Sequence, residues 1–144
     1  MKQKEREIIS HLRKDARSSL ASISHEIKMP ISTIYDKINK LHKNNVIKRY
    51  TTLVNFSDLG FHHHTKLILV IEKQQKQEFL NFLEDKKCIN SILEVNSGQE
   101  FIIEVLHENI KQYIEFKEEM LECFDMSDFK EYQIINEIER EKFL

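Results

Sequence analysis

The sequence predicts an α+β protein in two parts, the first helical and the second built around a sheet. In the first 43 residues, apolar side chains recur at helical spacing in three short stretches separated by turn residues. From residue 67 onward, short β-rich runs alternate with longer amphipathic stretches in the order strand, helix, strand, strand, helix, strand. We expect a first domain over residues 1–55, a linker over 56–64 with some strand at its edges, and a second domain over 65–144.

The composition is that of a folded protein in a reducing compartment. Of the 144 residues, 40% are hydrophobic and 32% are charged. No apolar run approaches the ~18 residues of a membrane span, and the N-terminus lacks a signal-peptide pattern, so we expect a cytoplasmic protein. Cys88 and Cys123 show no metal-binding spacing, and we expect two reduced, partly buried thiols.

The charges are divided unevenly between the two halves. Residues 1–60 carry 12 Lys or Arg and 6 Asp or Glu, whereas residues 61–144 carry 10 and 18. A basic first half suits a polyanionic partner, which the acidic second half would repel. Chance clustering of charges on solvated faces would give the same split, so the charge distribution alone does not show that the protein binds a polyanion.

The first two helices are predicted over residues 6–14 and 20–28. In the first, Ile8, Ile9 and Leu12 fall at helical spacing, and DARSS (15–19) follows as a turn. Either Ser18 or Ser19 is suited to cap the second helix. The apolar face of the second helix is formed by Leu20, Ile23 and Ile27.

The only proline, Pro30, separates the second helix from a third that runs to about Lys43. Proline disfavours a helical residue before it but fits the first helical turn. Asn44-Asn45 suits a left-handed C-cap, and the β-branched, aromatic stretch 46–56 predicts a short hairpin. Two helices about a tight turn, one helix before them and a hairpin after them form a winged helix-turn-helix. The residues expected to anchor the third helix are Ile31, Ile34, Ile38 and Leu41.

The second half predicts a four-stranded antiparallel sheet with two helices on one face. Strands are expected over 67–71, 91–96, 101–106 and 132–138, with a turn at 97–99. Helices are expected over 76–86 and 109–121. The first should direct Phe79, Phe82 and Leu83 inward. In the second, one face at helical spacing is formed by Ile110, Tyr113, Ile114, Lys117 and Leu121.

The third helix is the candidate for DNA recognition. Opposite its apolar face lie Ser32, Asp36, Asn39, Lys40 and Lys43, with Thr33 and Lys37 beside them. Hydroxyl, amide and ammonium groups hydrogen-bond base edges and phosphates, although every surface helix also has a polar face. The turn, the basic half and the following KRY segment favour DNA binding. Arg17, Lys48 and Arg49 are expected to contact phosphates.

Two stretches carry a resemblance to a known family. DARSSLASISHEI (15–27) and MPISTIYDKINKLHKNNVIKRYTTLVNFSDLG (29–60) resemble the winged helix-turn-helix of the Lrp/AsnC, or feast/famine, regulators. The matching motifs are the DxR turn at 15–17, the wing segment 46–50 and Leu59-Gly60. The βαββαβ half resembles the effector-binding and assembly domain of that family, mainly in the order of its elements.

The resemblance implies a DNA-binding transcription regulator without a cofactor. It implies dimers through the C-terminal sheets, further assembly into octamers or similar discs, and in many members a bound amino acid. Many members have Gly-x-x-Asp at the second sheet turn, where this chain has Gly98 and Glu100, so the effector site is either shifted by one residue or lost. The DNA-contacting positions that the resemblance and the helix pattern together indicate are Arg17, Ser32, Thr33, Tyr35, Asp36, Lys37, Lys40, Lys48 and Arg49.

Asp36 and the missing serine before Pro30 depart from the family pattern. Relatives commonly have a basic residue where this chain has Asp36, which can accept a hydrogen bond from cytosine N4 or pair with Lys40 one turn away. The family's serine-proline helix start is Pro30-Ile31 here, so a side-chain cap is missing or displaced.

The remaining motifs suggest neither metal binding nor catalysis. In His62-His63-His64 alternate side chains point to opposite sides, which leaves too few converging ligands for a structural metal site. His107 is expected to be exposed. There is no phosphate-binding glycine loop, nucleophile elbow or HExxH, and an enzyme is not expected. A second interpretation remains, a small-molecule sensor or protein-interaction module with weak or vestigial DNA binding.

Overall fold

The computed structural model describes residues 2–96 and 98–144, and the chain divides into two compact units. The first unit extends to Leu53 and also includes Ile138–Leu144, and the second is Val54–Glu137. Residues 138–144, which the sequence assigned to the second domain, therefore belong to the first. Arg13 fixes them there, since its Nε donates to the Phe143 carbonyl at 2.7 Å and its Nη2 to Glu141 Oε2 at 2.9 Å.

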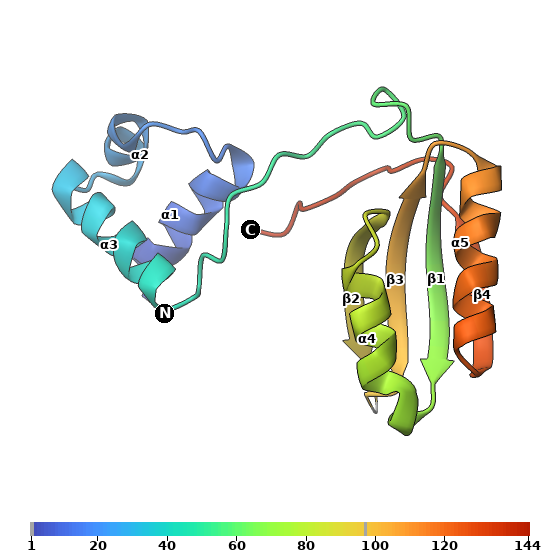
Figure 1. Ribbon diagram of the computed structural model, residues 1–144. Helices are drawn as coiled ribbons and strands as arrows, with labels where there is room; N and C mark the ends of the chain where they lie inside the picture. The colour runs from blue at the N-terminus through green and yellow to red at the C-terminus, as the bar shows by residue number, and fades with distance from the viewer. Residues whose placement is uncertain (1, 97) are drawn as a thin grey trace. The chain divides into compact units, whose positions relative to one another are not determined.

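Three helices form the body of the first unit: α1 (Gln3–Lys14), α2 (Leu20–Ile27) and α3 (Ile31–Lys43) (Figure 1). Their apolar faces meet in one small core, as the helical spacing predicted. Two of the predicted α3 anchors lie outside that core: Ile31, in the first turn of the helix, is 48% exposed, whereas Leu41 is buried. The core consists of Ile8, Ile23, Ile27, Ile34 and Ile38, with Leu12, Leu20, Met29 and Ile47 against it.

Local hydrogen bonds set the ends of these helices. Ser19 Oγ accepts from Ser22 N at 3.0 Å and caps α2, one of the two predicted caps. Lys28 takes a left-handed conformation (φ 53°) and the chain turns through Met29 and Pro30 into α3, which confirms the three-residue turn. Asn45 (φ 55°) follows the end of α3 as predicted. Its N–H donates to His42 O, and the next N–H, from Val46, donates to Leu41 O.

The predicted hairpin over 46–56 is wrong, because the segment from Val46 to Phe56 contains no strand. Val46 and Ile47 donate their N–H groups back to Leu41 instead of to a partner strand. Tyr50 Oη lies 3.2 Å from His42 Nε2, and the two rings meet edge to face. The wing segment is therefore an extended chain that the end of α3 holds in place.

The second unit has the predicted βαββαβ order, with a short 3₁₀ turn added (Figure 1). All strand pairs are antiparallel, in the order β2-β3-β1-β4. Ser97, in the predicted turn, lies outside the described residues. The elements are β1 (His63–Ile71), η1 (Lys73–Gln75), α4 (Lys76–Glu84), β2 (Ile89–Val95), β3 (Glu100–His107), α5 (Ile110–Cys123) and β4 (Met126–Gln133).

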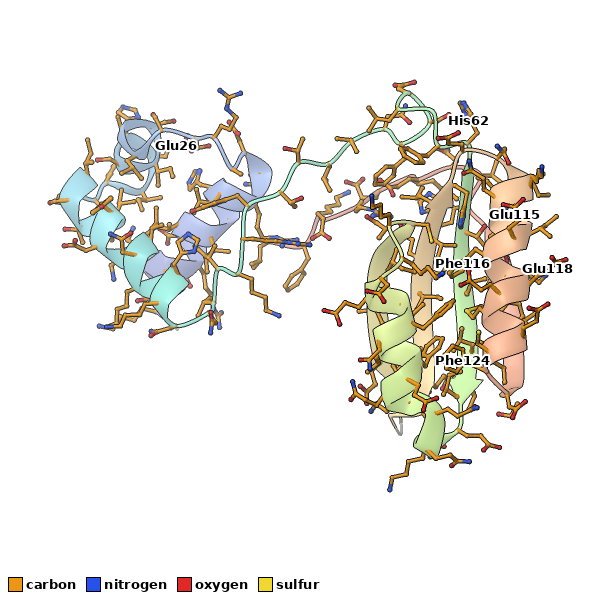
Figure 2. All side chains as sticks on the ribbon, viewed as in Figure 1. Glu26, His62, Glu115, Phe116, Glu118 and Phe124 are labelled. Atoms are coloured by element: carbon orange, nitrogen blue, oxygen red, sulfur yellow. The ribbon has the colours of Figure 1, made fainter. Side chains whose placement is uncertain are left out.

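Both helices cover the same face of the sheet and enclose the main core. Alternate residues of β1 and β3 point into it, and Phe79, Leu83, Tyr113, Phe116 and Met120 meet them from α4 and α5. Figure 2 shows Phe116 and Phe124 directed toward the sheet, whereas Glu115 and Glu118 point away from it. The predicted inner face of α5 is therefore only partly right: Tyr113 is buried, but Ile110, Ile114 and Leu121 are 61%, 43% and 42% exposed.

The last strand also lies elsewhere than predicted. β4 is Met126–Gln133, not 132–138, and it pairs with β1 at the sheet edge. Only Met126 and Phe129 of β4 add apolar side chains to the core, so its alternation is weak in the sequence. β1 begins at His63, at the edge of the predicted linker, where some strand was expected.

Candidate nucleic-acid interface

The outer face of α3 carries polar side chains, and the inner face of the same helix is packed into the first unit. Ile34, Ile38 and Leu41 are buried beneath it. The three-residue turn before α3 leaves its N-terminal half accessible, as a helix that enters a DNA major groove requires. Seven of the predicted or pattern-matched contact residues on this helix are exposed: Ser32, Thr33, Tyr35, Asp36, Asn39, Lys40 and Lys43.

Lys37 differs from the other predicted DNA contacts because it faces α1. Its Nζ lies 3.6 Å from Glu5 Oε1, and its side chain is only 24% exposed. The pKa of Glu5 is lowered, chiefly because the Lys2 backbone N–H donates to it at 3.0 Å, with Lys37 adding to the effect. Lys37 thus supports the packing of α3 on α1, at the border of the exposed face.

Asp36 and Lys40 do not form the ion pair that the sequence allowed, as far as the described residues extend. Both are exposed and free to meet a ligand. Asn39 and Lys43 lie on the same face, and the helical periodicity already indicated both. The face therefore combines hydroxyl, amide, ammonium and carboxylate groups, a mixture able to distinguish base edges.

The predicted phosphate contacts come from two segments of the first unit. Arg17 lies in the α1–α2 turn, which Asp15 braces by accepting the Arg17 N–H at 2.8 Å. Lys48 and Arg49 follow α3 and line a small hollow with Ile9, Leu12 and other residues. All three basic residues are exposed, and none forms an ion pair with another described residue. The absence of a hairpin places Lys48 and Arg49 beside α1, not at the tip of a wing.

The candidate effector residues lie at the β2–β3 turn. Gly98 has φ +81°, and a Cβ there would lie 2.7 Å from Glu94 Oε1. Glu94 also binds Lys76 Nζ at 2.5 Å. The Glu100 carboxylate accepts a hydrogen bond from the Asn96 side chain, so one of its oxygens already has a partner.

The three consecutive histidines point in different directions. His62 Nδ1 lies 3.2 Å from Ser57 Oγ, His63 is buried under α5 beside the Tyr113 ring, and His64 faces the other side of the sheet. There His64 Nε2 lies 2.6 Å from Glu104 Oε1, a buried carboxylate that also accepts from Asn90 at 3.1 Å. Among residues 2–96 and 98–144, no three His, Cys, Asp or Glu side chains are grouped to hold a metal ion.

Two further expectations need correction. His107 is buried, not exposed, because it ends β3 beneath α5. Of the two free thiols, Cys88 is partly buried as predicted but Cys123 is exposed. No helix in the described part of the chain is both long and apolar enough to cross a membrane.

Comparison with known proteins agrees with this geometry. A family described as winged helix-turn-helix DNA-binding matches residues 1–48. The HTH-type transcriptional regulator PF0864 of Pyrococcus furiosus is 31% identical over 122 residues, which cover 80% of this chain and 75% of that protein. The solved structure of PF0864 is described as a member of the AsnC family. It matches this chain with a TM-score of 0.74 at 23% identity, and the match covers 99% of this chain and 94% of the PF0864 chain.

Two other solved structures share the fold over nearly their whole length. LrpC of B. subtilis matches with a TM-score of 0.83 at 18% identity. This match covers 96% of this chain and 97% of the LrpC chain. The regulator NMB0573 of Neisseria meningitidis, solved with L-methionine, matches with a TM-score of 0.86 at 12% identity. This match covers 100% of this chain and 96% of NMB0573. Together with the identity to PF0864, these matches show that the chain belongs to the Lrp/AsnC family of DNA-binding helix-turn-helix transcriptional regulators.

Proposed function

We propose that this regulator recognises specific DNA sites by placing α3 in the major groove. The observation that carries the proposal is an exposed polar face on α3, a helix that follows a three-residue turn and whose opposite face is buried at Ile34, Ile38 and Leu41. Asp36, Asn39 and Lys40 would read base edges. Arg17, Lys48 and Arg49 would hold phosphates and so supply affinity with little sequence preference.

We further propose that two copies pair through the uncovered face of the sheet. Direct cross-strand partners Leu93, Ile102 and Ile68 form an apolar row across that face. Leu93 and Tyr132, which also points to this face, are 55% and 54% exposed, and neither helix covers them. A two-fold pair would present two α3 helices to a roughly palindromic site.

Assembly beyond a dimer would use a second apolar surface. Ile110, Ile114 and Leu121 form an exposed stripe along α5, on the opposite side of the second unit from the uncovered sheet face. A closed ring of dimers needs two different interfaces on each subunit. The sheet face and the α5 stripe would supply them.

An amino-acid effector at the β2–β3 turn is a second candidate activity. NMB0573 was solved with L-methionine, and this chain shares its fold. Glu100 would be the group that meets an amino function, although Asn96 already engages it. An amino-acid panel in a thermal-shift assay tests the idea: a shift that Glu100→Gln abolishes supports this site, and no shift for any amino acid refutes it.

Selection of bound sequences from a random duplex pool, followed by a salt titration on the selected site, tests DNA recognition. Five basic residues that lie on the outer face of α3 or are predicted phosphate contacts form no ion pair within the described residues. Two subunits would therefore neutralise up to ten phosphates and give a slope of log affinity against log salt near −9. The proposal fails if no sequence is enriched and duplex binding is undetectable at low salt. These cations are Arg17, Lys40, Lys43, Lys48 and Arg49.

Asp36→Ala is the specificity test for the same helix. If Asp36 reads cytosine, this variant should accept a broader set of selected sites while the oligomeric state stays unchanged. Selection profiles identical to those of the unmodified protein would show that Asp36 is not a reading residue.

A further inference from the structure

The chain after α3 carries two basic residues between two anchoring residues. Ile47 packs against the core of the first unit, and Tyr50 meets His42 in the last turn of α3. Lys48 and Arg49 lie between these anchors, and both are exposed. Because this segment forms no strand, the two anchors restrain the cations that a hairpin would otherwise have positioned.

The contact between His42 and Tyr50 combines a hydrogen bond with ring packing. Tyr50 Oη lies 3.2 Å from His42 Nε2, and the two ring centroids are 5.3 Å apart at an interplanar angle of 66°. A tyrosine hydroxyl both donates and accepts hydrogen bonds, so it can pair with either protonation state of the imidazole. His42 belongs to a helix whose next turn is closed by Asn45 N donating to His42 O at 3.0 Å. Tyr50 is therefore joined to a rigid helix end.

The anchor at Ile47 does not hold the chain beyond it. The N–H groups of Val46 and Ile47 both donate to Leu41 O, at 2.9 and 3.2 Å, and this pairing stops at Ile47. Among residues 2–96 and 98–144, the only hydrogen bond made by residues 48–50 is the one between Tyr50 and His42. Tyr50 itself is 49% exposed and lies outside the helical core. Without His42, the segment would be fixed at one end only.

A segment fixed at both ends is better prepared to hold phosphates than a loose one. Ordering a flexible backbone opposes binding, because each residue loses conformational freedom when it is held in one position. Lys48 and Arg49 have already lost part of this freedom in the free protein. Restraint of this kind before binding increases affinity without adding a contact to the ligand.

We propose that His42 and Tyr50 form a latch that positions Lys48 and Arg49 for phosphate contact. The latch residues act through the two cations and do not touch DNA themselves, so they are positioning residues. The proposal rests on DNA recognition by the first unit and adds to it two residues for which neither the helix pattern nor the polar face of α3 gives a role.

Limited trypsin digestion of the full-length protein tests the latch without DNA, because Lys48 and Arg49 are themselves cleavage sites. Proteolysis follows the population of the locally open form when opening is fast relative to cleavage. Tyr50→Phe removes the hydroxyl and keeps the ring, so it should speed cleavage after Lys48 and Arg49 by about 2- to 10-fold. Cleavage after Arg17, in the exposed α1–α2 turn, is the internal control and should not change.

The salt dependence of DNA binding separates positioning from direct phosphate contact. The Tyr50→Phe protein keeps every phosphate-contacting cation. Its plot of log affinity against log salt should therefore stay parallel to that of the unmodified protein, with affinity lower by about 2- to 10-fold per subunit. Lys48→Ala removes a contact and should instead reduce the slope by about 1.8 for two subunits. Fluorescence anisotropy with a labelled selected duplex measures both effects.

A double-mutant cycle shows whether His42 and Tyr50 act as one unit. His42→Ala removes the partner of the Tyr50 hydroxyl and ring, and it should weaken DNA binding at least as much as Tyr50→Phe does. In the His42→Ala protein, Tyr50→Phe should then have no further effect, because the contact is already lost. A Tyr50 hydroxyl that touched DNA directly would instead lower affinity in both backgrounds.

Several results would overturn the latch. Unchanged cleavage after Lys48 and Arg49 in Tyr50→Phe would do so, as would equal acceleration at Arg17, which reports general loosening of the unit. A flatter salt slope for Tyr50→Phe or additive effects in the cycle would also overturn it. Unchanged affinity in the latch variants, with normal binding by the unmodified protein, refutes the latch and leaves DNA recognition standing. Absence of duplex binding by the unmodified protein overturns both proposals.

Discussion

Lys37 and Lys40 lie on the same helix and look equivalent in the sequence, yet the structure predicts opposite roles for them in DNA binding. Lys40 is exposed and unpaired within the described residues, whereas Lys37 is directed at Glu5 of α1. Each phosphate contact contributes about 0.9 to the slope of log affinity against log salt. Lys40→Ala should therefore reduce the slope by about 1.8 for the two helices of a dimer.

This slope difference is large enough to measure. Over a fourfold rise in salt, a slope change of 1.8 corresponds to about a 12-fold difference in retained affinity. Fluorescence anisotropy with a labelled selected duplex, between about 50 and about 200 mM salt, resolves such a difference. The unmodified protein should lose about 12-fold more affinity than Lys40→Ala across this range.

The matched control removes the Lys37–Glu5 pair without changing the net charge. A protein with Lys37→Gln and Glu5→Gln together should keep the original salt slope and show only a lower melting temperature. If the Lys40→Ala slope equals that of the unmodified protein, or the paired variant loses as much slope as Lys40→Ala, the assignment of roles is wrong.

Three further predictions concern stability. Burial lowers the pKa of His63 and of His107, so these histidines bind protons more readily in the unfolded chain than in the folded one. Their contribution to the free energy of unfolding should therefore be fully present above pH ~6.5 and decrease as the pH falls below that value. Urea unfolding midpoints measured at a series of pH values would show this decrease. Ile34→Ala should destabilise the first unit by about 2–5 kcal/mol and leave hydrogen exchange in β1 and β3 unchanged. Ser19→Ala should cost about 1 kcal/mol in chemical unfolding, and Ser18→Ala, which removes no cap, should cost almost nothing.

The sequence predicted those elements whose signals are local. The three helices before residue 44 were found from apolar spacing, and their ends from serine, proline and asparagine, because caps and turns depend on neighbouring residues. The antiparallel sheet followed from the order of its elements. Family membership followed from a motif that spans the α2–α3 turn and α3.

The errors arose where distant partners decide the structure. β-branched residues at 46–56 favoured a hairpin, but a strand needs a partner and the end of α3 supplied other hydrogen bonds. On α5, Phe116 and Met120 took the buried side because the sheet accommodates them, which turned Ile110 and Ile114 outward. Neither choice is encoded in the periodicity of the segment itself.

The candidate sites show the same limit. The polar face of α3 was evident from the helical wheel, but the Lys37 contact joins residues 32 positions apart and needs the packed helices to appear. His107 is buried because α5 packs over the end of β3, whereas the sequence pattern had suggested an exposed histidine. Spacing identifies which residues share a face of one element and does not show what that face meets.

The return of Ile138–Leu144 to the first unit changes how the DNA-binding part is tethered. The chain crosses between the units at residue 53 and again at residue 137, and Arg13 fastens the returning end. The first unit is therefore not one continuous segment of the chain: it is assembled from the start of the sequence and from residues 138–144, and a truncation that removes these last residues would take away part of the same unit as the three helices.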